Sequence, residues 1–298
     1  MVTMHGPVDG EGGLYYELLG RSVSMVAISN AQRRANPRIN WCATVHNAID
    51  VASFPYRADK DDYVLWIGRF THDKAPQLAI DAARAAGRRI VLAGKRNEAA
   101  EHEFFDAHVR PRLGPDVEYV VEADAATKKE LFAGARSLVF PIQWDEPFGM
   151  VMIEAMACGT PVVATRRGSV PEVVSHGRTG LILRADAEVA AIAQAIEDAE
   201  ALEPGACRAL VEKSFDLSVM AAGYEDAYRS LLAGSDSAAR LSRTSTTAVG
   251  HSAVIEGVGG TWRMGVPVVD SGPVATRRVT AQLREITDVA VRPDSACP

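Results

Sequence analysis

Short, strongly apolar runs alternate with amphipathic, Ala-rich segments from residue 63 onward. Each apolar run is followed by a polar or glycine-bearing loop, a pattern that predicts a strand and then a helix. The expected strands are 63–68, 89–94, 117–121, 137–141, 161–165 and 180–184, and the expected helices between them are 75–86, 98–110, 126–135, 149–158 and 170–176. Such alternation indicates a parallel sheet with right-handed crossovers, and uniformly apolar strands indicate that both faces are covered. The chain is therefore expected to form an α/β fold around a doubly wound parallel sheet.

The residues before this region follow a similar alternation on a smaller scale. Residues 1–62 contain a helical stretch, GLYYELLGR, a strand-like stretch, SVSMVAIS, and a segment INWCATVHNAID that ends in turn residues. We interpret them as the last part of another α/β unit with the segment that joins it to the next domain. About sixty residues cannot make a whole doubly wound sheet, so the chain is expected to begin inside a domain.

The residues after the last strand change character. Helical patterns at 187–200, 205–213 and 217–232 complete a domain that we place at 63–232. Residues 233–298 begin with a Ser/Thr/Ala/Gly-rich stretch without apolar periodicity, interpreted as a linker to about residue 252. The remainder is left unassigned, because candidate strands in SAVIEGV and VPVVDS and a candidate helix in RRVTAQLREI are too few for a core.

Composition and charge narrow the classes of function. The 298 residues allow one or two domains, and 47% hydrophobic with 23% charged residues is ordinary for a soluble globular protein. A formal net charge of -6 provides no basic field for a polyanion, so nucleic acid is not an expected partner. The four cysteines form no C-x-x-C pair, which argues against a zinc site and a disulfide framework. No apolar run approaches the roughly 20 residues of a membrane span, and the start lacks a signal peptide, so a cytoplasmic location is expected, with peripheral membrane association left open.

Charged side chains follow three of the expected strands. Arg69 and Lys74 follow the first strand of the sheet, Lys95 follows the second, and IQWDEPFG, which contains Glu146, follows the fourth. The carboxyl ends of parallel strands share one edge, where ligands bind. An Arg and a Lys in a loop that opens a helix suit a diphosphate. Alone they would read as an ordinary surface pair, and only the agreement between the loops favours a site.

The helix expected at 149–158 adds an anion site and a second carboxylate. Gly149 lets a ligand approach the backbone, and the free N–H groups of Gly149, Met150 and Val151 lie at the positive end of the helix dipole. Glu154 lies just over one turn further along the helix, while Glu146 lies on the other side of the anion site. Two carboxylates that flank a diphosphate site match the layout of a nucleoside diphosphate sugar. Taken alone, the two glutamates could equally be structural, with Glu154 paired to a buried Arg or capping a neighbouring element.

Three segments then point to a known family. WIGRF with a Lys five residues after its Arg, EPFGMVMIEAMACGTPVVA, and GSVPEVVSHGRTG resemble the retaining glycosyltransferases of family four, which have the two-domain GT-B architecture; the resemblance covers about residues 1–232. It implies a Rossmann-like donor domain at 63–232 and a hexosyl-type, metal-independent glycosyltransferase of carbohydrate biosynthesis. No cofactor is implied, the donor being a nucleoside diphosphate sugar and the acceptor a saccharide or other hydroxyl compound. The resemblance implies that Arg69 and Lys74 bind the diphosphate, that Glu154 binds the ribose hydroxyls and that Glu146 contacts the transferred sugar. It also implies that the backbone of Phe148 and Gly149 contacts sugar hydroxyls, and that the backbone of Met150 and Val151 contacts phosphate.

The N-terminal segment resembles the family less completely. TMHGP resembles the loop that carries a catalytic histidine, which would be His5. Ala48 and Ala75 stand where the family usually has Gly. Most of the acceptor-binding sheet that the family places before the histidine is absent, so the chain is expected to bind the donor weakly and to transfer little.

Other readings of the sequence are weaker. DKD at 59–61 resembles the D-x-D of metal-dependent transferases, but it precedes a strand and so lies at the wrong edge of the sheet. The P-loop, the dinucleotide G-x-G-x-x-G and the G-x-S-x-G hydrolase elbow are all missing from the sequence. Two alternatives stay open: a sugar-nucleotide epimerase of the same architecture, and a non-catalytic module that binds nucleotide sugars.

Overall fold

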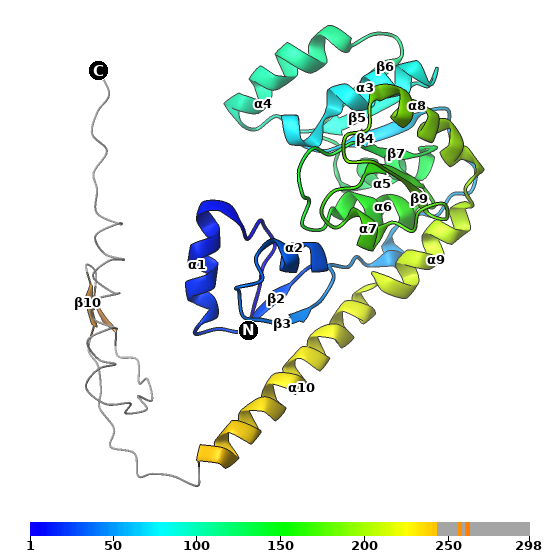
Figure 1. Ribbon diagram of the computed structural model, residues 1–298. Helices are drawn as coiled ribbons and strands as arrows, with labels where there is room; N and C mark the ends of the chain where they lie inside the picture. Colours follow the sequence, from blue (N-terminus) through cyan, green and yellow to red (C-terminus); the bar gives the residue numbers. More distant parts are fainter. Residues whose placement is uncertain (243–254, 258–259, 263–298) are drawn as a thin grey trace, which may run out of the picture. The chain divides into compact units, whose positions relative to one another are not determined.

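The computed structural model describes residues 1–242, 255–257 and 260–262 (Figure 1). The chain forms two units, Met1–Leu232 and Ala233–Pro298. The first unit contains every candidate site residue. Within the described residues, no helix is long and apolar enough to cross a membrane.

A six-stranded parallel sheet is the centre of the first unit, as the apolar runs predict. Its strands are β4 Val64–Ile67, β5 Ile90–Gly94, β6 Val117–Val121, β7 Leu138–Phe140, β8 Val162–Thr165 and β9 Gly180–Leu183. They lie in the order β6-β5-β4-β7-β8-β9, and every neighbouring pair is parallel. The chain order reverses between β4 and β7, so this pair of strands is the switch point where an open α/β sheet binds its ligand.

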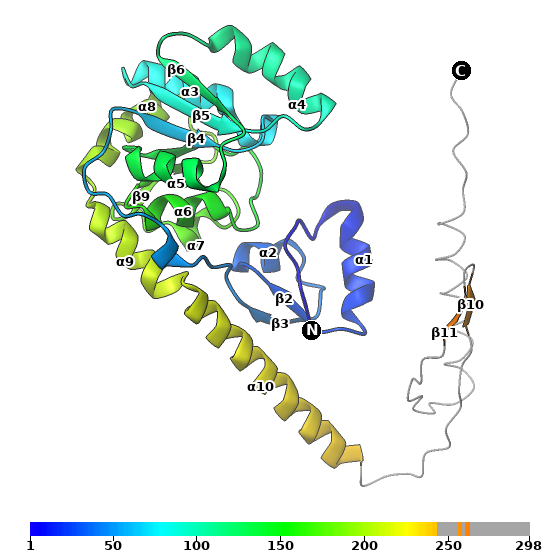
Figure 2. The same ribbon diagram turned by 180° about the vertical axis from the view of Figure 1, so that it is seen from behind.

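Helices cover both faces of the sheet (Figures 1 and 2). One face packs against α3 Pro76–Ala85, α8 Val189–Asp198 and the end of a helix that starts as α4 Ala99–Phe104 and continues through the π turn Phe105–Val109 and the 3-10 turn Arg110–Arg112. The other face packs against α5 Ala125–Gly134, α6 Met150–Ala157, α7 Val170–Val173 and α9 Pro204–Ser214. Successive strand residues point to opposite faces, so Val64 and Trp66 join the first core while Leu65 and Ile67 join the second. The doubly wound fold is confirmed.

The N-terminal residues form a smaller parallel sheet of three strands. Its strands are β1 Val2–Thr3, β2 Met25–Ala27 and β3 Trp41–Thr44, in that order, and its helices are α1 Gly10–Gly20 and α2 Asn30–Ala35. Met4, Val8, Met25, Ala27, Ile39 and Trp41 form its core. The helix expected in GLYYELLGR and the strand expected in SVSMVAIS are confirmed. The 3-10 turn Val51–Ser53 follows β3 and precedes β4.

The predicted boundaries fail in two places. The helix expected at 170–176 is only α7, because the chain turns extended at Val174. The helix expected to end at Leu232 is α10 Leu217–Ser242, which runs ten residues further into the segment interpreted as a linker. In the second unit, β10 Ile255–Gly257 and β11 Gly260–Trp262 pair antiparallel, and β10 falls within SAVIEGV. The rest of the expected linker, the strand in VPVVDS and the helix in RRVTAQLREI lie outside the described residues.

Candidate active site

The loop after β4 carries the two predicted diphosphate ligands to the switch point. Lys74 ends the 3-10 turn His72–Lys74, and α3 starts two residues later. Ala75 joins them in the left-handed conformation, with φ 49° and ψ 50°, although it is not glycine. Arg69 is exposed, and its side chain makes no hydrogen bond or ion pair with the described residues. A guanidinium without a protein partner at this edge is available to an anionic ligand.

The structure pairs Lys74 with Glu146. The Lys74 ammonium bonds Glu146 Oε2, and the two side chains are only 15% and 13% exposed. The same ammonium lies 4.8 Å from the centroid of the Trp144 ring. A carboxylate this well covered needs a cation or hydrogen-bond donors, and Lys74 supplies both. The loop after β4 and the turn after β7 thus meet through this pair.

The turn that opens α6 has the geometry that EPFG predicts. Gly149 has φ 75°, and a Cβ there would come within 2.7 Å of Met152 Cε, so this position favours glycine. The first N–H groups of a helix have no intrahelical acceptor, so those of Met150 and Val151 can serve an anion. Phe148 is buried, and its carbonyl accepts a hydrogen bond of 2.8 Å from Ser169 Oγ.

Glu154 is paired with Lys128, a residue that the sequence analysis did not single out. Lys128 Nζ lies 2.8 Å from Oε1 and 2.7 Å from Oε2, but only the contact to Oε1 has hydrogen-bond geometry. Oε2 is buried and accepts no hydrogen bond from the described residues. The alternative partner considered for Glu154, a buried Arg, is therefore wrong. Lys128 lies in the first turn of the helix after β6, and this position at the carboxyl edge is the signal that could have identified it.

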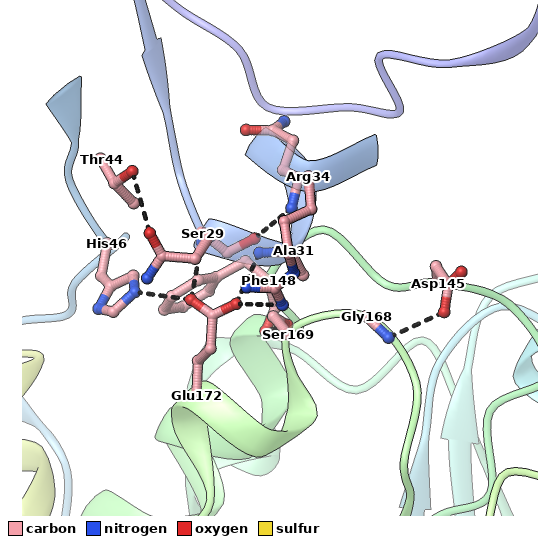
Figure 3. A network of polar contacts seen from close by, with 12 residues as sticks. Ser29, Ala31, Arg34, Thr44, His46, Asp145, Phe148, Gly168, Ser169 and Glu172 are labelled. Carbon is pink, nitrogen blue, oxygen red and sulfur yellow. Dashed lines mark hydrogen bonds and ion pairs between the residues drawn. The ribbon is translucent and has the colours of Figure 1, made fainter. Parts of the chain in front are cut away.

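The loop after β8 supports the turn that carries Glu146. The amide of Ser169 donates to the Glu146 carbonyl at 2.9 Å. The amide of Gly168 donates to Asp145 Oδ1 at 3.0 Å (Figure 3). Gly168 has φ 51°, and a Cβ there would overlap the backbone of Glu146. The close approach therefore depends on glycine.

His5 lies in the loop after β1 and is exposed, and its side chain makes no hydrogen bond, ion pair or ring contact with the described residues. The residues that follow it, Pro7 to Asp9, line a cavity of about 230 Å³ together with residues 144–147, Gly168 and part of α2. The N-terminal segment therefore reaches Glu146, although no contact brings His5 itself onto it. Within the described residues, no cluster of His, Cys, Asp or Glu could hold a metal ion.

Comparisons with known proteins identify the family of this chain. The family model described as "Glycosyl transferases group 1" matches residues 51–215. A D-inositol 3-phosphate glycosyltransferase of Mycobacteroides abscessus is 34% identical over 136 residues, which are 44% of this chain and 30% of that protein. A glycogen synthase of Mycobacterium tuberculosis is 28% identical over 169 residues, which are 54% of this chain and 40% of that protein. The matches thus span well under half the length of these curated relatives.

Solved structures resemble this one over more of the chain. AviGT4, a glycosyltransferase involved in avilamycin A biosynthesis, superimposes with a TM-score of 0.59 at 27% identity, over 70% of this chain and 64% of that one. Alr3699/HepE of Anabaena, in complex with UDP and glucose, has a TM-score of 0.66 at 20% identity, over 77% of this chain and 71% of that one. The second likeness shows the shared fold alone. Because the family model matches more than half of its residues, this chain belongs to the group 1 glycosyl transferases.

Proposed function

We propose that this chain binds a nucleoside diphosphate sugar at the carboxyl edge of its six-stranded sheet and transfers the sugar to a hydroxyl group of an acceptor, with retention at the anomeric carbon. The observation that carries this proposal is Glu154 Oε2, a buried carboxylate oxygen that accepts no hydrogen bond within the described residues and lies one turn beyond the start of α6. The Lys128 ammonium compensates the charge of this carboxylate, but Oε2 still lacks a donor with hydrogen-bond geometry among the described residues, and a ligand can supply one. Ribose hydroxyls supply such donors.

The rest of the site fits the remainder of that ligand. We assign the diphosphate to the exposed Arg69 guanidinium, to the first amides of α6 and to the Lys74 ammonium, which would share its bonds between Glu146 and a phosphate oxygen. We assign the sugar to Glu146. During transfer, the bond between the anomeric carbon and the diphosphate breaks, a bond to the acceptor oxygen forms, and a nucleoside diphosphate and a proton are released. Negative charge grows on the diphosphate as it leaves, so these cations and amides stabilise the transition state. We propose a hexosyl donor and no metal ion, because protein groups supply the positive charge.

Several relatives support this choice of substrates. Related structures of the Anabaena protein are complexes with UDP and with UDP-glucose, and several curated relatives are named for transfer to D-inositol 3-phosphate. Those ligands are known for those proteins. For this chain they define the first nucleotides to test, and a saccharide or another polyhydroxyl compound is the class of acceptor proposed. A cytoplasmic location stays a prediction.

Calorimetry can test the donor site directly. The parent chain should bind one of UDP, GDP or ADP, and Arg69→Ala should weaken that binding about tenfold or more while leaving the weaker binding of the matching nucleoside unchanged. Arg178→Ala, at an exposed arginine in the turn before β9, is the matched control and should change the affinity for neither the nucleoside diphosphate nor the nucleoside. If Arg69→Ala bound the diphosphate as well as the parent chain does, the diphosphate site would be elsewhere.

Product analysis separates transfer from the two other readings. A labelled nucleotide sugar incubated with acceptor should yield a glycoside, although slowly for this chain. A changed sugar with donor alone would instead identify an epimerase. Binding without any product, with or without acceptor, would identify a non-catalytic module.

A further inference from the structure

The amino end of α2 is capped by a residue from the other domain. Ser29 Oγ accepts from the amide of Gln32 at 3.0 Å, as an N-cap residue should. The preceding two amides, of Asn30 and Ala31, donate to Glu172 Oε2 and Oε1 at 2.7 and 2.6 Å. Glu172 lies on α7, about 140 positions further along the chain, so one carboxylate satisfies two helix amides across the domain boundary (Figure 3).

The surroundings keep this carboxylate ionised. Its side chain is 14% exposed, and His46 Nε2 and Arg34 Nη2 lie 3.5 and 3.4 Å from its oxygens. Burial alone would raise the pKa of Glu172, but the hydrogen bonds from His46 and from the two α2 amides outweigh it, and the pKa lies below its ordinary value. The carboxylate also lies at the positive end of α2. The contact is therefore an ionised carboxylate held by hydrogen bonds from two helix amides and from His46, whereas the exposed Arg34 adds little to it.

A short path joins Glu172 to the turn that carries Glu146. Ser169 precedes α7 directly, and it bonds the carbonyls of both Glu146 and Phe148. From the other side, the His46 ring lies 5.8 Å from the Phe148 ring, centroid to centroid. The turn after β7 is thus contacted by Ser169, which precedes α7, and by His46, which follows β3, and Glu172 bonds both His46 and α2 (Figure 3).

We propose that Glu172 is a positioning residue for the transferred sugar: by holding the amino end of α2 against α7, it fixes the N-terminal segment beside the turn that carries Glu146. The cavity lined by Pro7 to Asp9 and by residues 144–147 keeps its shape only while this contact is made. The nucleotide part of the site, at Glu154 and Lys128, lies on α6 and α5, and these two side chains pair with each other and form no hydrogen bond or ion pair with α2 within the described residues. This inference rests on the proposed function, since it concerns where the sugar of the donor is held.

Glu172→Gln in the full chain tests the inference through two measurements. The amides of Asn30 and Ala31 should exchange with deuterium about tenfold faster, because the charged acceptor is gone. The affinity for the nucleoside diphosphate should stay within about twofold of the parent chain, while the affinity for the nucleotide sugar should fall about fivefold or more. Glu225→Gln, which removes an exposed carboxylate paired with Arg229, is the matched control and should change neither measurement.

Each other outcome has a definite meaning. Unchanged exchange at the two amides would mean that the contact does not hold α2, and equal weakening of nucleotide and nucleotide sugar would mean a general loss of structure; either overturns the inference. Faster exchange with unchanged binding of the sugar would overturn it as well. A parent chain that binds no nucleoside diphosphate at all would instead overturn the proposed function, and this inference with it.

Discussion

Each carboxylate of the candidate site is held by one lysine. Lys74 pairs with Glu146 and Lys128 pairs with Glu154, so both charges are compensated in the absence of a ligand. The pair with Lys128 answers why the apolar helix α6 tolerates Glu154 in its middle. The sequence could place the carboxylates and Lys74 at one edge of the sheet, because strand ends locate them. It could not assign the pairs, because the partners are 72 and 26 positions apart.

The two ion pairs predict that replacing Glu154 and replacing Glu146 will weaken the binding of different ligands. Glu154→Ala should weaken binding of the bare nucleoside diphosphate by roughly 1.5 to 3 kcal/mol, because charge-assisted bonds to ribose hydroxyls are lost. Glu146→Ala should leave that binding intact or tighten it slightly, since Lys74 becomes free for the diphosphate, and should weaken only the binding of the full nucleotide sugar. Calorimetry with both ligands measures this. Equal effects of the two variants on the bare nucleotide would contradict the division of roles.

Ala75 carries backbone strain beside the site. A left-handed alanine costs about 1 kcal/mol or more, whereas glycine adopts this conformation freely. Ala75 is also fully buried, so Ala75→Gly loses the contacts of a methyl group as well as the strain, and the free energy of unfolding should change by less than about 0.5 kcal/mol. Urea unfolding measures this change. Ala79→Gly, at an equally buried alanine in the interior of α3, releases no strain and should destabilise by about 1 kcal/mol or more, and an equal loss of stability at both positions would show that residue 75 is not strained.

At the scale of elements, the loop between β8 and α7 does the most to shape the site. Ser169 in this loop bonds the turn after β7, and Glu172, on the helix α7 that follows directly, bonds the amino end of α2. The sequence of this segment, GSVPE, was part of the family resemblance, but no role could be assigned to it, because the bonds it makes join segments far apart in the chain. The helix boundaries show the same limit: α10 continues to Ser242 although its last residues lack apolar periodicity, so local pattern did not predict its end.

Gly168 offers a test of this loop. In Gly168→Ala, the new methyl group would overlap the backbone of Glu146, so the turn must shift. We expect the affinity for the nucleotide sugar to fall about tenfold or more, with a smaller change for the bare nucleotide. Gly177→Ala is the matched control, since Gly177 also has a positive φ but a Cβ there would meet nothing within 4 Å. If both variants had the same effect, backbone strain alone would explain the loss.

At the scale of the whole molecule, the sheet was the most predictable part. Its four central strands, β5, β4, β7 and β8, are apolar because helices cover both of their faces, and this pattern is visible in the sequence. The position of the site followed from the strand ends. The contacts between the N-terminal segment and the donor domain could not be predicted, because they depend on how the small three-stranded sheet and its helices pack against the donor domain. The hydrogen bonds in this interface come from single residues such as Glu172 and His46.

The stability of the molecule at alkaline pH depends on a buried group of two thiols and an amine. Burial raises the pKa of Cys158 and of Cys207 to about 12, and burial lowers the pKa of Lys60 to about 8. Between pH 9 and 10, each folded thiol therefore keeps a proton that the unfolded chain loses, which lowers stability as pH rises. The effect of Lys60 on stability is opposite. In this range the unfolded chain still binds a proton that the folded chain has released, so stability rises with pH.

Because the two effects oppose each other, replacement of the thiols should reverse the direction in which stability changes with pH. With two thiols against one amine, the free energy of unfolding of the parent chain should fall by roughly 1.4 kcal/mol between pH 9 and pH 10, which corresponds to one net proton. The double variant Cys158→Ala, Cys207→Ala retains the amine and Tyr63, whose pKa burial raises to about 12, so its free energy of unfolding should still rise over the same range, but by less than about 1.4 kcal/mol. Urea unfolding under reducing conditions at pH 8.5, 9 and 10 measures both slopes, and Cys42→Ala, at a less buried thiol, should keep the downward slope of the parent chain. A double variant that still loses stability in this range would show that the two thiols are not held neutral by burial and that other groups carry the alkaline loss.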